Sequence, residues 1–448
     1  RNSLQRLSTF LIPECSLLIK LFEMEMKTSG GVSPGDIEIM APAGNFESLV
    51  AAIQGGADSV YFGVGNLNMR SHSANNFGVD SLPEIARICR EAGVKSYLTL
   101  NIVIYDKDLE SMRQTLDAAV EAGISAVIAS DIAVILYARE RGMEVHISTQ
   151  LNVSNIESVR YHARFADVVV LARELTLFQV KDIYDAILKE RITGPSGELV
   201  RLELFCHGAL CMAVSGKCYL SLHEYNASAN RGSCYQICRR SYEVKDKETG
   251  NTLEIDNEYI MSPKDLSTIA FVDKIIDSGV RVLKIEGRAR APEYVKMVAS
   301  AYRRAADAVC NGTYNAGFVG GLQQELSSVF NRGFWDGYYQ GARLGEWSDV
   351  YGNKATRKKS YVGKVTNFFS NLSVAEVLIE TGEISKGDLI LIIGPSTGVI
   401  EHTVDEIRVA LKEVQKSVKG EYCSIPLPQG VRLRRSDKIY LFREAGHE

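Results

Sequence analysis

The sequence has no long uninterrupted apolar run near its start, where a signal peptide or a membrane anchor would stand. The apolar stretch from Phe10 to Phe22 is interrupted by Glu14 and Lys20. A signal peptide needs a continuous apolar centre, and a membrane span needs about 20 predominantly apolar residues. We therefore expect residues 1 to 35 to be a leader outside the fold, and the protein to be cytoplasmic with no membrane partner.

The sequence also lacks the usual motifs of peptidases. It has no HExxH zinc-binding pattern, and no GxSxG pentapeptide stands at a turn from a strand to a helix. A cysteine protease needs a low-pKa thiol beside a histidine in space. Cys206 and His207 are neighbours only in sequence. These absences disfavour a peptidase, which stays as an alternative.

Cysteines are concentrated in one segment, since five of the nine fall between residues 206 and 240. Structural disulfides are not expected in a reducing compartment, and zinc sites usually present paired C-x2-C knuckles. Four soft thiolates without a histidine in register favour a 4Fe-4S cluster. A zinc site and a set of inert thiols are the alternatives. The four predicted ligands have the spacing C-x6-C-x15-C-x3-C and are Cys211, Cys218, Cys234 and Cys238. Cys206 ends a predicted strand and is expected to face the core.

Short β-rich runs alternate with helical stretches from Ile37 onward, a pattern typical of βα units around a parallel sheet. Eight strands with one extra predict a TIM-like barrel over residues 36 to 352, in preference to an open doubly wound sheet. A helical stripe of Ile85, Ile88 and Cys89, ended by Gly93, supports this reading. The runs are 37 to 41, 59 to 63, 95 to 100, 126 to 130, 145 to 149, 168 to 172, 202 to 206, 258 to 261 and 281 to 287.

The composition changes after Gly352. Residues 353 to 360 are expected to be a linker, and residues 361 to 448 a small β-barrel, because alternating strands are separated by Gly, Asn and Asp turns. The phrases GDLILIIGP and SDKIYLF are similar to the second-domain barrel of translation elongation factors. From Lys354 onward there are fifteen Lys and Arg against twelve Asp and Glu, although the whole chain carries a net charge of -4. Such a module is compatible with a tRNA partner.

Polar side chains follow almost every predicted strand, and the working groups of TIM barrels stand at these carboxyl ends. Guanidinium forks recognise carboxylates, and amides supply both donors and acceptors. The alternative is that Arg173 pairs with Glu174 or another acid, and Arg288 with Glu286, to hold the rim of the barrel. The predicted substrate-binding residues are Arg70, Asn101, Gln150, Asn152, Arg173, Lys284, Glu286 and Arg288.

His207 and Glu203 are the predicted acid–base residues. His207 directly follows the run 202 to 206 and stands four residues before the first cluster cysteine. We therefore expect it near the cluster, as a proton donor or as a hydrogen-bond partner of a sulfur. A purely structural role is the alternative for His207. Arg231 and Arg239 are expected to balance the charge of the cluster, unless they lie on a solvated face.

The cysteine motifs carry a family resemblance. HGALCMAVSGKC followed by NRGSCYQICRRSYEV resembles the signature of the collagenase-like peptidase family U-32, and IMAPAGNFESLVAAIQGGADSVYFG, LKIEGRARAPEYV and FNRGFWDGYY extend the likeness. The resemblance implies that the four motif cysteines bind a 4Fe-4S cluster. It also implies oxygen-independent hydroxylation rather than proteolysis.

Within the family, the sequence is most similar to the tRNA hydroxylation branch. This implies 5-hydroxylation of the wobble uridine of tRNA, with prephenate as co-substrate or ligand and with an electron donor that the sequence does not identify. A dicarboxylate such as prephenate would need two cationic partners, which the predicted arginines offer. The alternatives are hydroxylation of a ribosomal RNA base, the peptidase of the family name, and a non-catalytic RNA-binding or assembly factor.

Overall fold

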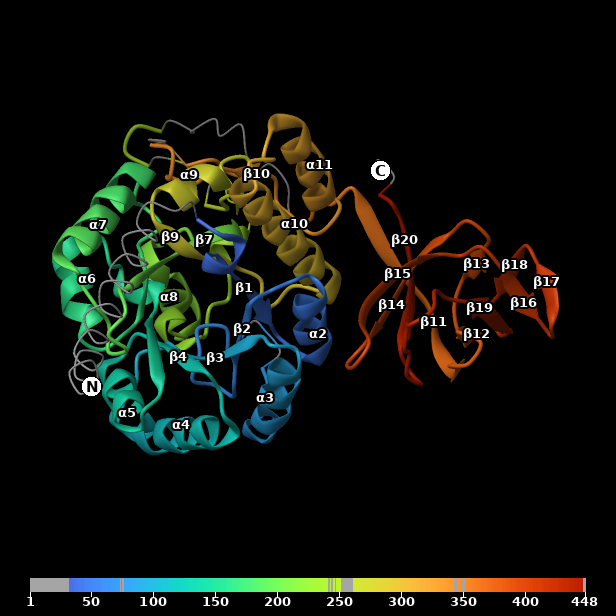
Figure 1. The fold of residues 1–448 in the computed structure, drawn as a ribbon. Coiled ribbons are helices and arrows are strands. Elements are labelled where there is room, and N and C mark those ends of the chain that lie inside the picture. The colour runs from blue at the N-terminus through green and yellow to red at the C-terminus, as the bar shows by residue number, and fades with distance from the viewer. Residues whose placement is uncertain are drawn as a thin grey trace, which may run out of the picture.

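The structure, a computed structural model, describes residues 32 to 445 apart from 73, 75, 241, 243, 244, 246, 251 to 260, 342 to 344 and 349 to 351. Most of it is a barrel of eight parallel strands (Figure 1). Strands β1 to β7 pair in chain order, and β9 closes the ring by pairing with β7 and β1. The predicted TIM-like barrel is therefore confirmed. The strands are β1 (Glu38–Ala43), β2 (Ser59–Gly63), β3 (Lys95–Leu100), β4 (Ala126–Ala129), β5 (Glu144–Ile147), β6 (Val168–Val170), β7 (Arg201–Gly208) and β9 (Val280–Ile285).

Two short strands extend the sheet at the end of β7. β8 (Asp265–Ser267) pairs antiparallel with β7, and β10 (Phe334–Trp335) pairs parallel with β8. Eight of the nine predicted runs correspond to barrel strands. The ninth, at 258 to 261, falls almost wholly outside the described residues.

Helices surround the barrel and bury their apolar faces against it (Figure 1). In α3, Ile85 and Cys89 are buried and Ile88 packs against the same core, as the stripe predicts. Gly93 follows with φ +69°, the left-handed conformation expected of a helix-ending glycine. No helix in the described part of the chain combines the length and apolar character needed to cross a membrane. The helices are α2 (Phe46–Gln54), α3 (Leu82–Glu91), α4 (Leu109–Ala122), α5 (Ile132–Glu140), α6 (Ile156–Ala163), α7 (Leu177–Glu190), α9 (Val272–Asp277), α10 (Pro292–Cys310) and α11 (Ala316–Ser327).

The C-terminal part is antiparallel β structure around its own apolar core. Its eight-stranded sheet has the order β15-β14-β20-β11-β12-β19-β16-β17, and β13 pairs with β18. Residues 357 to 360, assigned to a linker from the sequence, already belong to β11 because they pair with the last strand. The strands are β11 (Arg357–Phe369), β12 (Val374–Ile379), β13 (Glu383–Ser385), β14 (Leu389–Gly394), β15 (Gly398–Thr403), β16 (Ile407–Val409), β17 (Lys412–Val414), β18 (Lys416–Val418), β19 (Tyr422–Pro426) and β20 (Lys438–Glu444).

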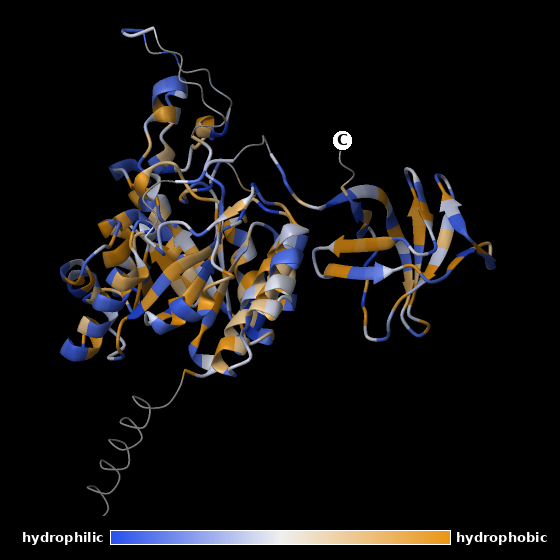
Figure 2. Ribbon diagram, turned by 90° about the horizontal axis from the view of Figure 1, so that it is seen from above, coloured by the Kyte–Doolittle hydropathy of each residue, from blue (hydrophilic) through white to orange (hydrophobic). Residues whose placement is uncertain are grey.

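The β module contacts the side of the barrel, next to α2 and α10 (Figures 1 and 2). Gln54 donates a hydrogen bond to the carbonyl of Thr397 at 2.8 Å and accepts one from the amide of Val399 at 2.9 Å. Lys296 donates to the carbonyl of Val399 at 2.8 Å. The module therefore lies beside the barrel, and leaves the mouth to the cysteine-rich segment.

Candidate functional site

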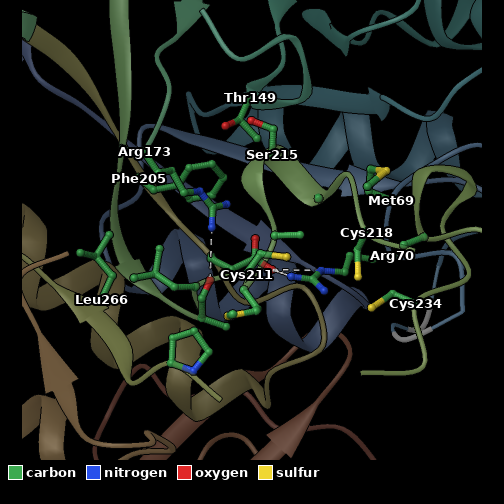
Figure 3. Close-up of a pocket in the computed structure, with 18 of the residues that line it drawn as sticks. Met69, Arg70, Thr149, Arg173, Phe205, Cys211, Ser215, Cys218, Cys234 and Leu266 are labelled. Atoms are coloured by element: carbon green, nitrogen blue, oxygen red, sulfur yellow. Dashed lines mark hydrogen bonds and ion pairs between the residues drawn. The ribbon is translucent and has the colours of Figure 1, made fainter. Parts of the chain in front are cut away.

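A cavity of about 250 Å³ opens at the carboxyl ends of the strands, under the segment 206 to 240 (Figure 3). Its walls come from the residues that follow β2, β3, β6 and β9 and from the cysteine-rich segment. The strand-end rule thus brings together residues far apart in sequence. Of the predicted site residues, the cavity is lined by Arg70, Asn101, Gln150, Arg173, Lys284, Glu286, Arg288, Cys211, Cys218, Cys234 and Cys238.

The cysteine-rich segment is held by short helical turns rather than by long elements. After β7 the chain forms η5 (Val214–Gly216), α8 (Leu220–Tyr225), η6 (Ala229–Arg231) and η7 (Ile237–Arg239), and α8 lies within the outline of the barrel in Figure 1. Arg231 fastens η6 by pairing with Asp108 at 2.6 Å. Arg231 therefore anchors the segment through this ion pair.

All four predicted ligands are free thiols on the cavity wall. Cys211 is exposed, and Cys218, Cys234 and Cys238 are half-buried. Burial raises the pKa of Cys238 to about 11, against the opposing effect of Arg239, and the other three thiols add to the rise. The four sulfurs are therefore near enough to influence one another.

The spacing of these thiols bears on the zinc alternative. No three His, Cys, Asp or Glu side chains in the described part of the chain are grouped closely enough to hold one metal ion. A tetrahedral zinc site with Zn–S bonds of about 2.3 Å requires sulfurs about 3.8 Å apart. A 4Fe-4S cluster binds each thiolate to a different iron and so accepts a wider spacing. The cluster stays a prediction, with zinc as its alternative.

Glu286 is the centre of charge on the wall formed by β9 and β2. Arg70 donates two hydrogen bonds to Glu286 Oε1, from Nη2 at 2.5 Å and from Nε at 3.1 Å. Burial acts to raise the pKa of Glu286, but Arg70, Arg173 and Arg288 outweigh it and hold the pKa at about 2. Glu286 is therefore a carboxylate at neutral pH.

Arg288 has a different partner from the one considered in the sequence. Its Nη1 donates to Asn68 Oδ1 and to Thr99 Oγ1, both at 2.9 Å. The pairing of Arg288 with Glu286 is therefore wrong, since Arg70 takes that place. Burial lowers the pKa of Arg288 to about 10, so it too is charged at neutral pH.

Arg173 is the least engaged cation of the predicted set. Its guanidinium lies over the Phe205 ring, 3.9 Å from the centroid, and its one hydrogen bond to a described residue is a long one of 3.5 Å to the carbonyl of Ala209. No ion pair with Glu174 forms among the described residues, which contradicts the rim-pairing alternative. Arg173 thus presents a charged fork to the cavity.

The amide residues form a network on the opposite wall. Asn101 Nδ2 donates to Gln150 Oε1 at 3.1 Å and to Ser148 Oγ at 3.2 Å. Asn152 does not line the cavity; it has a left-handed backbone with φ +53° and accepts a hydrogen bond from Ser215 Oγ at 2.8 Å. Asn152 therefore positions the cysteine-rich segment.

The predicted acid–base residues do not reach the cavity. Glu203 is fully buried inside the barrel and accepts a hydrogen bond of 2.6 Å from Lys284 Nζ. His207 is buried among Tyr294, Tyr302 and Phe334. The structure therefore does not place His207 on the cavity wall, and its role stays a prediction.

A shift in strand pairing explains the position of His207. In the ladder between β7 and β9, Phe205 is opposite Lys284 and His207 is opposite Ile285, so β7 carries one extra residue. Such a bulge breaks the alternation of side chains. Phe205 lines the cavity, whereas Cys206 donates to the Lys284 carbonyl at 3.4 Å and His207 turns toward α10. Cys206 faces the core, as predicted.

Burial makes His207 a source of acid sensitivity. Its pKa is lowered to about 3 by burial and by Arg290, against about 6.5 in an unfolded chain. Between these pH values the unfolded chain binds more protons, so stability falls as the pH falls. From pH 7 to pH 5, His207 should contribute a loss of about 2 kcal/mol. Urea unfolding should show this loss in the wild type and its absence in His207→Gln; an equal loss in both proteins would contradict the prediction.

Three arginines that line the cavity are outside the predicted substrate-binding set: Arg239, Arg290 and Arg332. Arg239 was considered only for charge balance; it donates to the carbonyls of Leu210 and Pro263 at 2.7 and 2.6 Å. Arg290 stands two residues after Arg288, and Arg332 follows α11, so neither marks a strand end of the barrel. The motif LKIEGRARAPEYV contains Arg290 and the motif FNRGFWDGYY contains Arg332, so these two motifs were the available signals.

Comparison with known proteins gives a consistent family. A family model described as peptidase family U32 matches residues 44–349. The protein named "Collagenase" of Porphyromonas gingivalis is 60% identical over 407 residues, which cover 91% of this chain and 98% of that protein. "tRNA hydroxylation protein P1" of Bacillus subtilis is 32% identical over 378 residues, 83% of this chain and 86% of that protein. "tRNA hydroxylation protein P" of Escherichia coli is 28% identical over 446 residues, 88% of this chain and 95% of that protein. This chain belongs to peptidase family U32.

Proposed function

We propose that this chain hydroxylates an RNA base with the help of a 4Fe-4S cluster bound by Cys211, Cys218, Cys234 and Cys238. The observation that carries the proposal is that these thiols share one cavity with seven Arg and Lys side chains and only two carboxylates. Four thiolates suit an iron–sulfur cluster, and the surplus of positive charge suits an anionic substrate. The names of the Bacillus and Escherichia relatives support RNA as the substrate.

The finer proposal is 5-hydroxylation of the wobble uridine of tRNA without molecular oxygen. With water as the source of the hydroxyl oxygen, replacement of C5–H by C5–OH releases two electrons and two protons, so the cluster, when bound, would pass electrons to an acceptor outside this chain. The residues of this chain bind and orient the reactants. Arg173 and Arg288 would hold the two carboxylates of prephenate, since each presents a charged guanidinium at the cavity. Asn101 and Gln150 would offer amide groups to the polar edge of the base.

The rim of the cavity also favours an RNA partner. Tyr219 is 81% exposed, and Tyr225 and Tyr235 are 43% and 42% exposed. The rings of Tyr225 and Tyr235 stack with centroids 4.7 Å apart, and Arg240 lies over Tyr225 at 5.6 Å. Exposed aromatic rings beside arginines are the surfaces on which unpaired bases stack. An RNA loop could therefore present one base to the cavity.

A peptidase is the second candidate, because the Porphyromonas relative is named collagenase. The residues support it less. Burial raises the pKa of the Cys206 thiol well above its usual range, and His207 faces Tyr302. These two residues do not form a thiolate–imidazole pair. Ser215 donates to Asn152, and none of its hydrogen-bond partners in the part of the chain that the structure describes is a base.

The test is an assay of tRNA nucleosides by mass spectrometry after incubation with anaerobically purified protein, an electron acceptor and prephenate. We expect 5-hydroxyuridine from the wild type. Arg173→Gln should lower its formation at least ten-fold with unchanged iron content, because a charged hydrogen-bonding partner is lost. Arg164→Gln, at an exposed site on the barrel surface, should match the wild type. Absence of the product from iron-loaded wild type, together with cleavage of collagen, would replace the proposal by the peptidase.

A further inference from the structure

Three arginines line the cavity on the side of β8, around one buried carboxylate. Arg332 Nη1 lies 3.4 Å from Asp265 Oδ1, and Arg290 Nη2 lies 3.6 Å from Asp265 Oδ2. Asp265 Oδ2 has no hydrogen-bond partner in the described part of the chain. Within the described residues, the third arginine, Arg239, bonds only to neutral groups: Ser262 Oγ and the carbonyls of Pro263 and Leu210. The Asp265 carboxylate thus lies near these guanidiniums, but its contacts with Arg290 and Arg332 are long.

The charges of the three arginines and Asp265 do not balance. Asp265 is 1% exposed and is not part of the cavity wall, whereas Arg239, Arg290 and Arg332 all are. The guanidiniums therefore stand between the carboxylate and the cavity, with three positive charges against one negative charge. Confined surplus charge of this kind is costly unless an anion compensates it.

We infer that Arg239, Arg290 and Arg332 bind an oxyanion group, a carboxylate or a phosphate, at this wall of the cavity. Planar guanidinium forks match the paired oxygens of both groups. The Phe330 ring, 3.6 Å from the Arg290 guanidinium, fixes the orientation of that fork. The site is separate from Arg70 and Glu286, which already satisfy each other.

The competing explanation is that these arginines offset the negative charge of the iron–sulfur cluster. It fits Arg239, which follows Cys238 directly. It fits Arg290 poorly: burial lowers the pKa of Arg290, and its strongest charged or titratable neighbours are Asp265, Tyr294, Arg332 and Glu286 rather than cysteines. The inference concerns binding alone, and it holds whether or not the chain modifies RNA.

The experiment is calorimetric titration of the anaerobically purified, cluster-loaded protein with inorganic phosphate and, separately, with succinate. At least one anion should bind the wild type. Arg290→Gln and Arg332→Gln should each weaken that binding ten-fold or more, and Asp265→Asn should strengthen it because the competing carboxylate is removed. Arg304→Gln, an exposed arginine paired with Glu325, should have no effect. A preference for phosphate identifies an RNA phosphate as the source, and a preference for succinate identifies a small organic acid.

Two results would overturn the inference. One is that neither anion binds the wild type. The other is that the Arg290 and Arg332 variants bind as the wild type does, with or without a loss of iron. Arg332→Lys keeps the charge but not the fork, so an affinity between those of wild type and Arg332→Gln would support bidentate recognition. Circular dichroism of each variant shows whether the barrel is folded.

Discussion

Cys234→Ala is expected to lose the iron and the visible absorption of the anaerobically purified protein while the barrel stays folded. Cys234 is half-buried on the cavity wall, which Cys211, Cys218 and Cys238 also line. With three thiolates left, a cluster of about four irons loses a ligand and becomes labile. Iron and sulfide analysis with an absorption spectrum measures the loss, and RNA hydroxylation should fall to background.

The segment should keep its place without the cluster, because contacts with the rest of the chain hold it. Arg231 pairs with Asp108 at 2.6 Å, and Arg239 donates to the Pro263 carbonyl at 2.6 Å. The matched controls are Cys310→Ala, half-buried outside the segment, and Cys206→Ala, buried within it. Both should retain iron. Iron kept by Cys234→Ala but lost from Cys206→Ala would show that the ligand set is wrong, and stoichiometric zinc in place of iron would return the zinc alternative.

The fold and most of the cavity wall could be predicted from sequence because both follow from one rule. Strands of a closed parallel barrel end at the same face, so Asn101 after β3 and Arg173 after β6 meet although they are far apart in the chain. The four cysteines could be assigned to one site from their spacing in the sequence. Neither prediction depends on the rotation of a single side chain.

The predictions that failed concern side chains whose direction depends on local backbone geometry. His207 follows Phe205 by two residues, so regular alternation would turn both to the cavity, but the bulge in β7 sends His207 toward Tyr302. Nothing in the residue types announces that bulge. Arg332 reaches the cavity from the loop after α11, outside the repeating βα pattern. Asp265, its partner, is in a short strand that follows residues outside the described part of the chain.

Lys284→Met is expected to destabilise the barrel by about 3 to 5 kcal/mol, because it leaves Glu203 as an unpaired charge inside the barrel. Lys284 Nζ lies 2.6 Å from Glu203 Oε1, and the two side chains are 5% and 0% exposed. Glu203 Oε2 has no hydrogen-bond partner among the described residues. Urea unfolding followed by circular dichroism measures the loss. Lys181→Met, in an exposed pair with Asp185 at 2.8 Å, should cost less than about 1 kcal/mol.

The double variant Lys284→Met with Glu203→Gln decides what the pair does. Removal of both charges should recover much of the stability lost in Lys284→Met, since a buried ion pair and neutral residues of similar size differ little in energy. Additive losses would contradict direct coupling. The outcome also bears on the predicted substrate role of Lys284. If its charge is neutralised by Glu203, an anionic substrate gains little from Lys284, and its recognition depends on the arginines, of which Arg173 has no carboxylate partner within the described chain.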